Sequence, residues 1–342
     1  MYILIAILLF GLLILVHEFG HYLTARIFKV TINEFSIGMG PKLISKKSKK
    51  TGIAYSLRLL PIGGFVSMAG EDEESDDENA FSKKPVWQRI IISVAGSLSN
   101  ILIGFLVMFI LVSTMPRIPS TVINDFTENS VSDSYGLMPG DRITEVAGHK
   151  VHIANEMVYF ISRYGAEPVD VKVVRDGKEL VLENVKFPTY SSGGMVFGDY
   201  DFYIRAADKN IGTVIKNGFH QATLTIRTVF DSLFDLITGK YGVKDLSGPV
   251  GVTNVISSAA KTGNAYQVFY IFVLLAMNLG IMNLIPFPAL DGGRVLMLII
   301  ELIIRRPVNK KVEGYINLIG MAILLLFMAF ITFKDITQLI RK

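Results

Sequence analysis

Four segments of the chain are apolar and long enough to cross a lipid bilayer. About 20 apolar residues are needed to span about 30 Å of hydrocarbon, and these segments occupy residues 1–25, 90–115, 268–285 and 316–333. The mean hydropathy is +0.45, with 51% hydrophobic and 19% charged residues. Because backbone polar groups inside a bilayer must be satisfied within the segment, such segments form helices. The sequence therefore predicts a polytopic α-helical membrane protein with four transmembrane helices.

The first apolar segment contains three ionisable residues, in His17-Glu18-Phe19-Gly20-His21. Ionisable side chains are costly in hydrocarbon, so their presence there indicates function more than an ordinary helix surface. On a helix the two histidines project from one face and can bind one metal ion, while Glu18 can take a proton from a water molecule. The segment lacks the basic start and cleavage site of a signal peptide, so we expect it to be retained. The motif predicts a hydrolytic metal site.

A catalytic zinc ion usually has three protein ligands, so the two histidines need a partner. The chain contains no cysteine, which leaves histidine and carboxylate side chains. The remaining histidines fall in the segment expected outside the membrane, so Asp291 and Glu301 are the acidic candidates. We expect Asp291 to be the third ligand; its alternative role, compatible with the first, is to cap a helix over residues 292–304. Glu301 is expected to form an ion pair with Arg305, four residues further on.

The segment before Asp291 breaks the helical pattern of the third apolar segment. Pro286 and Pro288 interrupt a helix, and Gly292 and Gly293 permit a tight turn. Irregular backbone at membrane depth is tolerated only where it lines protein or a wet cavity. This break supports the prediction of a site at Asp291.

Lysine and arginine are concentrated in two of the loops between the apolar segments. The positive-inside rule predicts that the loops at residues 26–89 and 305–311 are cytoplasmic. The N-terminus, residues 117–267 and the C-terminus then lie outside the cell, in a multi-pass protein of the plasma membrane whose site is near the cytoplasmic side. Because topology explains most of the net charge of +4, we predict no nucleic-acid partner.

The first cytoplasmic loop contains a strand-like pattern and an acidic run. Apolar residues from Ile53 to Leu59 alternate with small or polar ones before Pro61-Ile62-Gly63-Gly64 and a further apolar pair. This pattern is typical of a strand, a turn and a second strand, a hairpin that would dip toward the site. The acidic run at residues 71–78 is expected to be solvated and flexible, because like charges repel.

Together these motifs resemble the bacterial site-2 proteases, specifically the regulator-of-sigma-E protease group, with a single PDZ domain. The resemblance rests on the His17–His21 motif and Leu290-Asp291-Gly292-Gly293, with Gly96-Ser97-Leu98-Ser99-Asn100 and Ser247-Gly248-Pro249-Val250-Gly251 in support. Members of this family are zinc metalloproteases that cut transmembrane segments within the membrane. The resemblance implies a Zn²⁺ cofactor, with His17, His21 and Asp291 as its ligands and Glu18 as the catalytic base.

The resemblance also implies residues that bind substrate. Asn283 and Pro286 match positions thought to hold an unwound substrate backbone. The segment with Tyr55, Gly63 and Gly64 resembles the membrane-dipping β-loop of the family, which would add a strand to the substrate.

Asn100 matches a motif residue of the family whose role stays open. Gly96, Asn100 and Gly104 form a stripe of small and polar residues on one helix face. Such a stripe suits close contact between helices, so helix packing is the alternative to a role in the site.

The segment between the second and third apolar stretches resembles a PDZ domain around Ser134 to Ile143. In this α+β fold a loop of backbone N–H groups accepts a C-terminal carboxylate, and here the loop would be Tyr135-Gly136-Leu137-Met138. The alternative is that the domain only blocks access to the site. Residues 211–239 then predict an amphipathic helix, either lying on the outer membrane surface or packed against the PDZ-like domain.

The predicted function is hydrolysis of peptide bonds within transmembrane segments of single-span proteins, such as an anti-sigma factor or remnant signal peptides. A membrane metal transporter and a membrane-tethered PDZ adaptor are the alternatives. The predicted parts are residues 1–116, with two spans and the hairpin; 117–190, the PDZ-like domain; 191–266, a strand and the amphipathic helix; and 267–342, with the last two spans.

Overall fold

The computed structural model describes residues 2–71, 73–240, 242, 246 and 248–340. The chain forms two compact units. We call the first the membrane unit, Met1–Val107 with Val229–Lys342, and the second the sheet unit, Met108–Thr228. Each unit is described by itself below.

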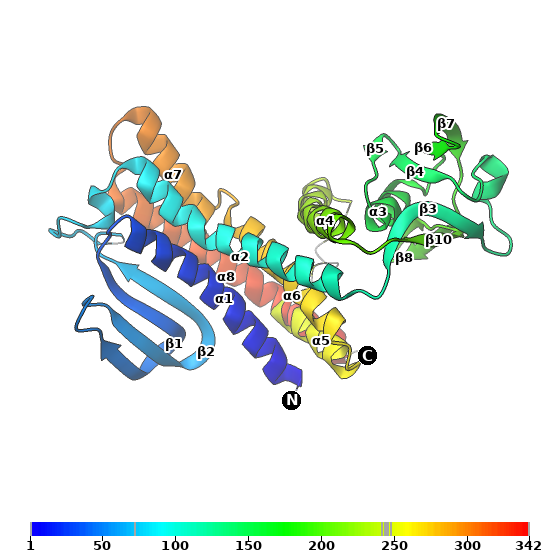
Figure 1. Cartoon of the computed structure of the whole chain (residues 1–342). Coiled ribbons are helices and arrows are strands. Elements are labelled where there is room, and N and C mark those ends of the chain that lie inside the picture. Colours follow the sequence, from blue (N-terminus) through cyan, green and yellow to red (C-terminus); the bar gives the residue numbers. More distant parts are fainter. Residues whose placement is uncertain (1, 72, 241, 243–245, 247, 341–342) are drawn as a thin grey trace. The chain divides into compact units, whose positions relative to one another are not determined.

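The described residues contain four helices that are long and apolar enough to cross a membrane. Their candidate spans are Leu4–Ile27, Val86–Thr114, Ala265–Asn283 and Lys311–Thr337, close to the four segments predicted from hydropathy. The multi-pass membrane architecture is therefore confirmed. The corresponding helices are α1 (Tyr2–Ile27), α2 (Val86–Thr114), α6 (Ala265–Asn283) and α8 (Lys310–Ile340) (Figure 1).

Two shorter helices complete the membrane unit, α5 (Pro249–Lys261) and α7 (Asp291–Ile304). The Gly248-Pro249-Val250-Gly251 part of the predicted motif forms the start of α5, whereas Ser247 lies outside the described residues. Asp335 on α8 is buried and accepts the backbone N–H groups of Gly248 and Gly251 at 2.9 and 2.8 Å. A carboxylate at a helix N-terminus satisfies donors that have no partner within the helix, so Asp335 fixes α5 on α8.

The cytoplasmic-loop pattern forms two long strands that lie beside α1, β1 (Ile32–Lys47) and β2 (Ala54–Met68) (Figure 1). The prediction that residues 55–66 form a hairpin is wrong, because the two halves of this segment pair with β1 and not with each other. Phe35 of β1 is registered with both Tyr55 and Val66, so the first half of β1 lies between the two halves of β2. Bends make this possible, because Gly38 and Gly63 have positive φ angles of 85° and 93°, which glycine adopts without strain.

An ion-pair network holds this bent sheet together. Glu34 on β1 accepts hydrogen bonds from Lys42 at 2.8 Å and from Arg58 at 3.0 Å. Burial by itself would raise the pKa of the Glu34 carboxyl group, but hydrogen bonds from Lys42, Ser56 and Arg58 outweigh it and lower the pKa below its usual value. The charged form of Glu34 is thus favoured, and it joins Lys42 of β1 to Arg58 of β2.

The sheet unit is an α+β fold built on one large sheet, with a separate two-stranded sheet of β8 and β9. Its strands follow the order β10-β3-β4-β6-β7, with β5 paired to β4, and helix α3 covers a core that includes Ile143, Met157 and Phe160. The last strand, β10, pairs with β3, so this unit extends beyond the predicted boundary at residue 190. Its strands are β3 (Ile118–Phe126), β4 (Arg142–Val146), β5 (His149–Lys150), β6 (Val169–Arg175), β7 (Lys178–Val185), β8 (Thr189–Ser192), β9 (Met195–Gly198) and β10 (Phe202–Ala207), and α3 is Ala154–Tyr164.

The predicted amphipathic helix is present as α4 (Ile211–Ile237). It starts in the sheet unit and continues along the chain past Thr228, the last residue of that unit. Ile211, Ile215 and Phe219 are exposed on one face, whereas Ala222 and Thr225 are buried. This asymmetry is that of an amphipathic helix with one apolar face uncovered.

Candidate active site

Three side-chain donors converge in the membrane unit. His17 Nε2 lies 3.2 Å from both His21 Nε2 and Asp291 Oδ2, and His21 Nε2 lies 3.5 Å from Asp291 Oδ2. Zinc binds nitrogen and oxygen ligands at about 2.0–2.2 Å, so ligands at the corners of a zinc tetrahedron lie roughly 3.3–3.6 Å apart. The donor types and their separations therefore fit one zinc ion, with the fourth corner left for water or substrate.

His21 is held in place by the backbone of α2. Its Nδ1 donates to the carbonyl oxygen of Ile92 at 2.8 Å, which leaves Nε2 as the nitrogen with a free lone pair. Gly96 lies directly against the ring, because a Cβ atom there would be 2.2 Å from His21 Nε2. A Cβ at Gly20 would similarly lie 2.3 Å from the carbonyl oxygen of Ala95. The two glycines thus allow α1 and α2 to approach closely enough for this contact.

Asn100 contacts His17, the first histidine of the motif. It is fully buried, its Nδ2 lies 3.5 Å from His17 Nδ1, and its Oδ1 has no hydrogen-bond partner among the residues that the structure describes. A histidine that binds metal through Nε2 carries its proton on Nδ1, and that proton needs an acceptor. A half-turn of the Asn100 amide brings Oδ1 to His17 and satisfies both groups. Asn100, for which helix packing and a role in the site were both open, therefore lies beside one of the three donors.

Asp291 is the first residue of α7, not the N-cap. The N-cap is Leu290, which makes no side-chain capping bond. The carboxylate of Asp291 instead accepts a hydrogen bond from Ser97 Oγ on α2 at 3.0 Å. A Cβ at Gly292 would lie 2.3 Å from the carbonyl oxygens of Leu284 and Ile285. The glycine therefore allows the proline-containing segment to pack closely on α7. This packing places Asp291 opposite the histidines.

Glu18 lines the same cavity as the three donors. The cavity has a volume of about 160 Å³. Gly64 of β2 lies behind the acid, since a Cβ there would be 3.4 Å from Glu18 Cγ and 2.8 Å from the carbonyl oxygen of Ser36. The residues that line the cavity are His17, Glu18, His21, Phe65, Val66, Met68, Glu71, Ile92, Ser93, Asp291 and Arg294.

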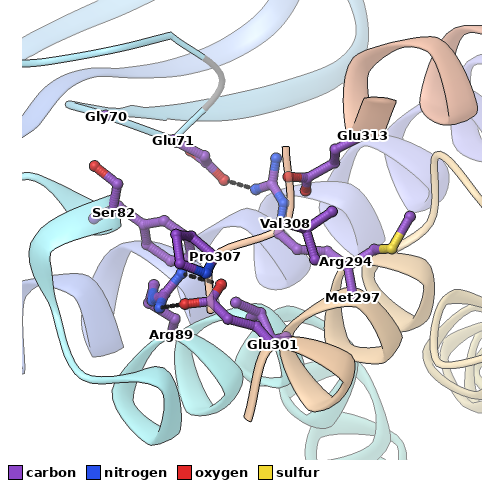
Figure 2. Close-up of a pocket in the computed structure, with 12 residues that line it drawn as sticks. Gly70, Glu71, Ser82, Arg89, Arg294, Met297, Glu301, Pro307, Val308 and Glu313 are labelled. Carbon is purple, nitrogen blue, oxygen red and sulfur yellow. Dashed lines mark hydrogen bonds and ion pairs between the residues drawn. The ribbon is translucent and has the colours of Figure 1, made fainter. Parts of the chain in front are cut away.

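A second cavity, of about 110 Å³, shares two wall residues with the first. Figure 2 shows the shared pair, Glu71 and Arg294, joined by an ion pair. A second ion pair crosses the same cavity, where Arg89 Nη2 lies 2.5 Å from Glu301 Oε1 and Arg89 Nη1 lies 3.1 Å from Glu301 Oε2 (Figure 2). Two buried or half-buried ion pairs thus line a polar chamber next to the donor cluster.

These ion pairs correct two predictions. Glu301 pairs with Arg89 of α2 and not with Arg305, because α7 ends at Ile304 and Arg305 has a left-handed backbone that breaks the expected i, i+4 geometry. Glu71, predicted to belong to a solvated acidic run, has a side chain only 12% exposed. The rest of the run from Glu73 to Glu78 is largely exposed, as expected.

The predicted substrate-binding residues of the membrane unit fall in different places. Asn283 is the last residue of α6 and is half-buried, and Pro286 is exposed in the segment that leads to Asp291. Gly63 provides the bend of β2, next to Gly64 at the cavity. Tyr55 lies on the half of β2 that β1 separates from the cavity, and its hydroxyl bonds that of Tyr22 at 2.7 Å.

The predicted carboxylate-binding loop of the sheet unit is partly satisfied by internal bonds. The N–H of Gly136 donates to the carbonyl oxygen of Asp133 at 3.0 Å, and that of Met138 donates to Asp141 Oδ2 at 2.9 Å. Leu137 is buried, whereas Tyr135 and Met138 are exposed. At least two of the four backbone donors from Tyr135 to Met138 are thus already engaged.

Ser97, Ile92, Glu71 and Arg294 are site residues that sequence reasoning did not identify. Ser97 carried a weak signal, since it is a polar residue in an otherwise apolar span and lies in the motif that contains Asn100. Ile92 contributes only its backbone carbonyl, which no side-chain pattern reveals. Glu71 and Arg294 are 223 positions apart, so their pairing is visible only in the folded chain.

Comparisons with known proteins find one matching family and relatives that match nearly the whole chain. The model of peptidase family M50 matches residues 5–327. A Clostridium acetobutylicum protein named as a zinc metalloprotease is 36% identical over 341 residues, which cover 98% of this chain and 97% of the relative. RasP, the regulator of sigma-W protease of Bacillus subtilis, is 29% identical with 97% of each chain covered, and the zinc metalloprotease RasP of Geobacillus kaustophilus is 30% identical with the same coverage.

These matches favour proteolysis over the metal-transport and adaptor alternatives. The family match covers most of the chain, and the relatives match it over nearly its full length. Zinc is the cofactor that the relatives' names give, and the donor set fits it. The chain belongs to peptidase family M50 and is a zinc metalloprotease of the membrane.

Proposed function

We propose that His17, His21 and Asp291 are the zinc ligands of this intramembrane protease and that Glu18 is its catalytic base. The observation that carries the proposal is the meeting of three donors, at mutual distances of 3.2–3.5 Å, with a second carboxylate in one cavity. A ligand set with an adjacent base is what metal-assisted hydrolysis needs.

The residues around the donors supply the chemistry of the proposed reaction. Zinc, when bound, polarises the scissile carbonyl group and makes water acidic enough to lose a proton near neutral pH. Glu18 takes that proton and later delivers it to the leaving amine. The peptide carbon gains the hydroxyl group as the C–N bond breaks, which leaves one carboxylate and one amine product. Ser97 and the carbonyl of Ile92 keep Asp291 and His21 oriented throughout.

The half of β2 from Gly64 to Met68 is the proposed docking strand for substrate. It pairs with β1 on one side, and no other strand of the described chain pairs with it. Phe65, Val66 and Met68 of this half line the cavity. A substrate helix must unwind before its carbonyl groups can be attacked, and pairing with an open strand edge offsets the lost helical hydrogen bonds. Asn283 and Pro286 are proposed to support the unwound backbone.

The polar chamber behind Glu71 and Arg294 supports a route for water. Hydrolysis in a membrane requires water at the zinc site and polar surroundings for the charged ends of the product. The chamber adjoins the active-site cavity and is lined by five charged side chains, four of which form two ion pairs. We infer that Glu71 and Arg294 form the barrier between the two spaces.

The proposed topology has the β1–β2 sheet in or near the cytoplasm and the sheet unit outside the cell. Nine lysine and arginine residues between Lys29 and Lys84 support this orientation under the positive-inside rule. We propose that the sheet unit is a PDZ-like domain that limits access to the site, because at least half of the donors in its Tyr135–Met138 loop are internally bonded. Capture of a C-terminal peptide there is the alternative.

The proposed substrates are single-span membrane proteins. The name of RasP, regulator of sigma-W protease, suggests an anti-sigma factor as one of them, and remnant signal peptides have the same single apolar segment. Both classes present a single apolar segment to the site.

The experiment uses the purified full chain in liposomes with a panel of tagged single-span peptides. We expect cuts inside the apolar segment, located by mass spectrometry of the products, and inhibition by the zinc chelator phenanthroline that added zinc reverses. Cuts confined to the flanking polar residues, or cleavage that persists in phenanthroline, would contradict the proposal.

A further inference from the structure

The sheet unit contains a second cluster of two histidines and one carboxylate. His152 Nδ1 lies 3.1 Å from Glu156 Oε2, and His220 Nδ1 lies 3.2 Å from Glu156 Oε1. The two imidazole rings stack at 14° with their centroids 4.1 Å apart. All three donors lie within 4.8 Å of one another, and within the described residues only this group and that of His17, His21 and Asp291 meet the condition.

Two of the three donors lie on helices, and the third, His152, directly precedes α3. Glu156 is buried in the first turn of α3, where its Oε2 also accepts the backbone N–H of His152 at 2.6 Å. His220 lies on α4, and its neighbour Gln221 accepts a hydrogen bond from Asn155 of α3 at 2.6 Å. Because α3 and α4 are joined beside the cluster, the donors stay close without a metal. Such preorganisation lowers the entropy lost on binding.

We propose that His152, Glu156 and His220 bind a divalent transition-metal ion, with zinc as the expected occupant. Two imidazoles and a carboxylate are a donor set that zinc accepts. The side chain of His152 is 42% exposed, which gives the ion a path to the buried carboxylate. The carboxylate of this cluster is itself a donor, so the group has no base of its own.

The consequence of metal binding is a cross-link between α3 and α4. His152 lies just before the N-cap of α3 and Glu156 in its first turn, whereas His220 belongs to the first half of α4. Helix α4 continues along the chain from the sheet unit into the membrane unit. A bound ion therefore fixes the sheet-unit end of the helix that connects the two units. This inference does not depend on the proposed substrates.

The test counts zinc ions on the purified full chain in detergent, after chelation and dialysis against micromolar zinc. We expect two zinc ions per chain in the unaltered protein and one in His152→Ala, His220→Ala and the double variant His17→Ala/His21→Ala. His149→Ala is the matched control and should retain two, because His149 stacks on Tyr164 outside the cluster. One ion in the unaltered protein, or two in both His152→Ala and His220→Ala, would overturn the proposal.

A second measurement guards against a variant that merely folds poorly. In the His17→Ala/His21→Ala protein, zinc should raise the midpoint of thermal unfolding, because ligand that binds the native state stabilises it. The addition of His152→Ala should abolish that shift and leave the midpoint without zinc nearly unchanged, since this side chain is half exposed. A zinc-induced shift that survives His152→Ala contradicts the site.

Discussion

The membrane unit and the sheet unit each bring two histidines and one carboxylate together, and their surroundings give them different chemistry. In the membrane unit Glu18 shares the cavity with the donors, so a water molecule can meet the ligands and a base at once. In the sheet unit the carboxylate, Glu156, is already a donor. The comparison teaches that a ligand set alone does not make a hydrolytic site, and that the acid beside it does.

The two clusters also differ in how their donors are supported. In the membrane unit each donor has a partner on α2: Ile92 for His21, Asn100 for His17 and Ser97 for Asp291. Such outer contacts fix the orientation of ligands and strengthen metal binding. In the sheet unit the contacts of this kind go to Glu156, which accepts hydrogen bonds from the backbone N–H groups of His152 and Ile153. We therefore expect the membrane site to bind zinc more tightly.

The largest expected effect comes from removing Glu18, the proposed base that distinguishes the two clusters. Glu18→Gln keeps the shape of the side chain but cannot accept a proton, so cleavage of a single-span peptide should slow by roughly a hundredfold to ten-thousandfold. Glu78→Gln, an exposed acid of the same unit, is the control and should cleave normally. Initial rates in liposomes measure the difference. Cleavage by Glu18→Gln within a few-fold of the unaltered rate would break the comparison.

The next effect comes from the close contact between α1 and α2. A Cβ at Gly96 would lie 2.2 Å from His21 Nε2, so Gly96→Ala should displace the imidazole and weaken zinc binding about tenfold to a hundredfold, as loss of a supporting contact does. Gly104→Ala on the same helix is the matched control, since its Cβ would meet the flexible side chain of Met277. Chelator competition measures both. Equal zinc affinities in the two variants would contradict the account.

Substitutions of Asn100 test whether hydrogen bonds to the donors explain the expected difference in zinc affinity between the two clusters. Asn100→Leu removes the acceptor for His17 and should lower zinc affinity about tenfold or more, whereas Asn100→Asp keeps an acceptor and should retain more of it. Ser113→Ala, on the exposed end of the same helix, serves as the control. The same chelator competition applies. If Asn100→Asp binds zinc no better than Asn100→Leu, Asn100 acts through packing alone.

The smallest expected effect concerns the barrier at the polar chamber, which has no counterpart in the second cluster. The chain has no cysteine, so Ser93→Cys places a single thiol in the wall of the active-site cavity. Glu71→Gln breaks the ion pair with Arg294 and should raise the rate of labelling by a water-soluble thiol reagent severalfold. Glu74→Gln, which is exposed, is the control. Equal labelling rates would show that the ion pair is no barrier.

The sequence predicted the four spans and the three donors because each has a strong local signal. Apolar runs of about 20 residues specify membrane helices directly, and His17 and His21 lie on one face of such a helix. Asp291 followed from the lack of cysteine and from the prolines before it. Only the folded structure shows that Asp291 is the first residue of α7 and not its cap, because sequence patterns locate helix ends only to within a residue or two.

The features that sequence did not predict depend on contacts between distant segments. The pairing of β1 between the halves of β2 depends on bends at Gly38 and Gly63, and a strand pattern by itself does not name its partner. The ion pair of Glu301 with Arg89 joins two helices 212 residues apart in sequence, so the local i, i+4 rule selected the wrong partner. The second histidine cluster likewise forms only when α3 and α4 meet.

Zinc occupancy measured on the Asp291→Ala and Glu18→Gln proteins, both in a His220→Ala background, tests the central claim most directly. This background removes the proposed second site, so one ion per chain reports the membrane site alone. We predict about one zinc ion in the Glu18→Gln protein with no cleavage of a single-span peptide, and loss of both zinc and cleavage in the Asp291→Ala protein. Full zinc occupancy in the Asp291→Ala protein would contradict the ligand assignment on which the account rests.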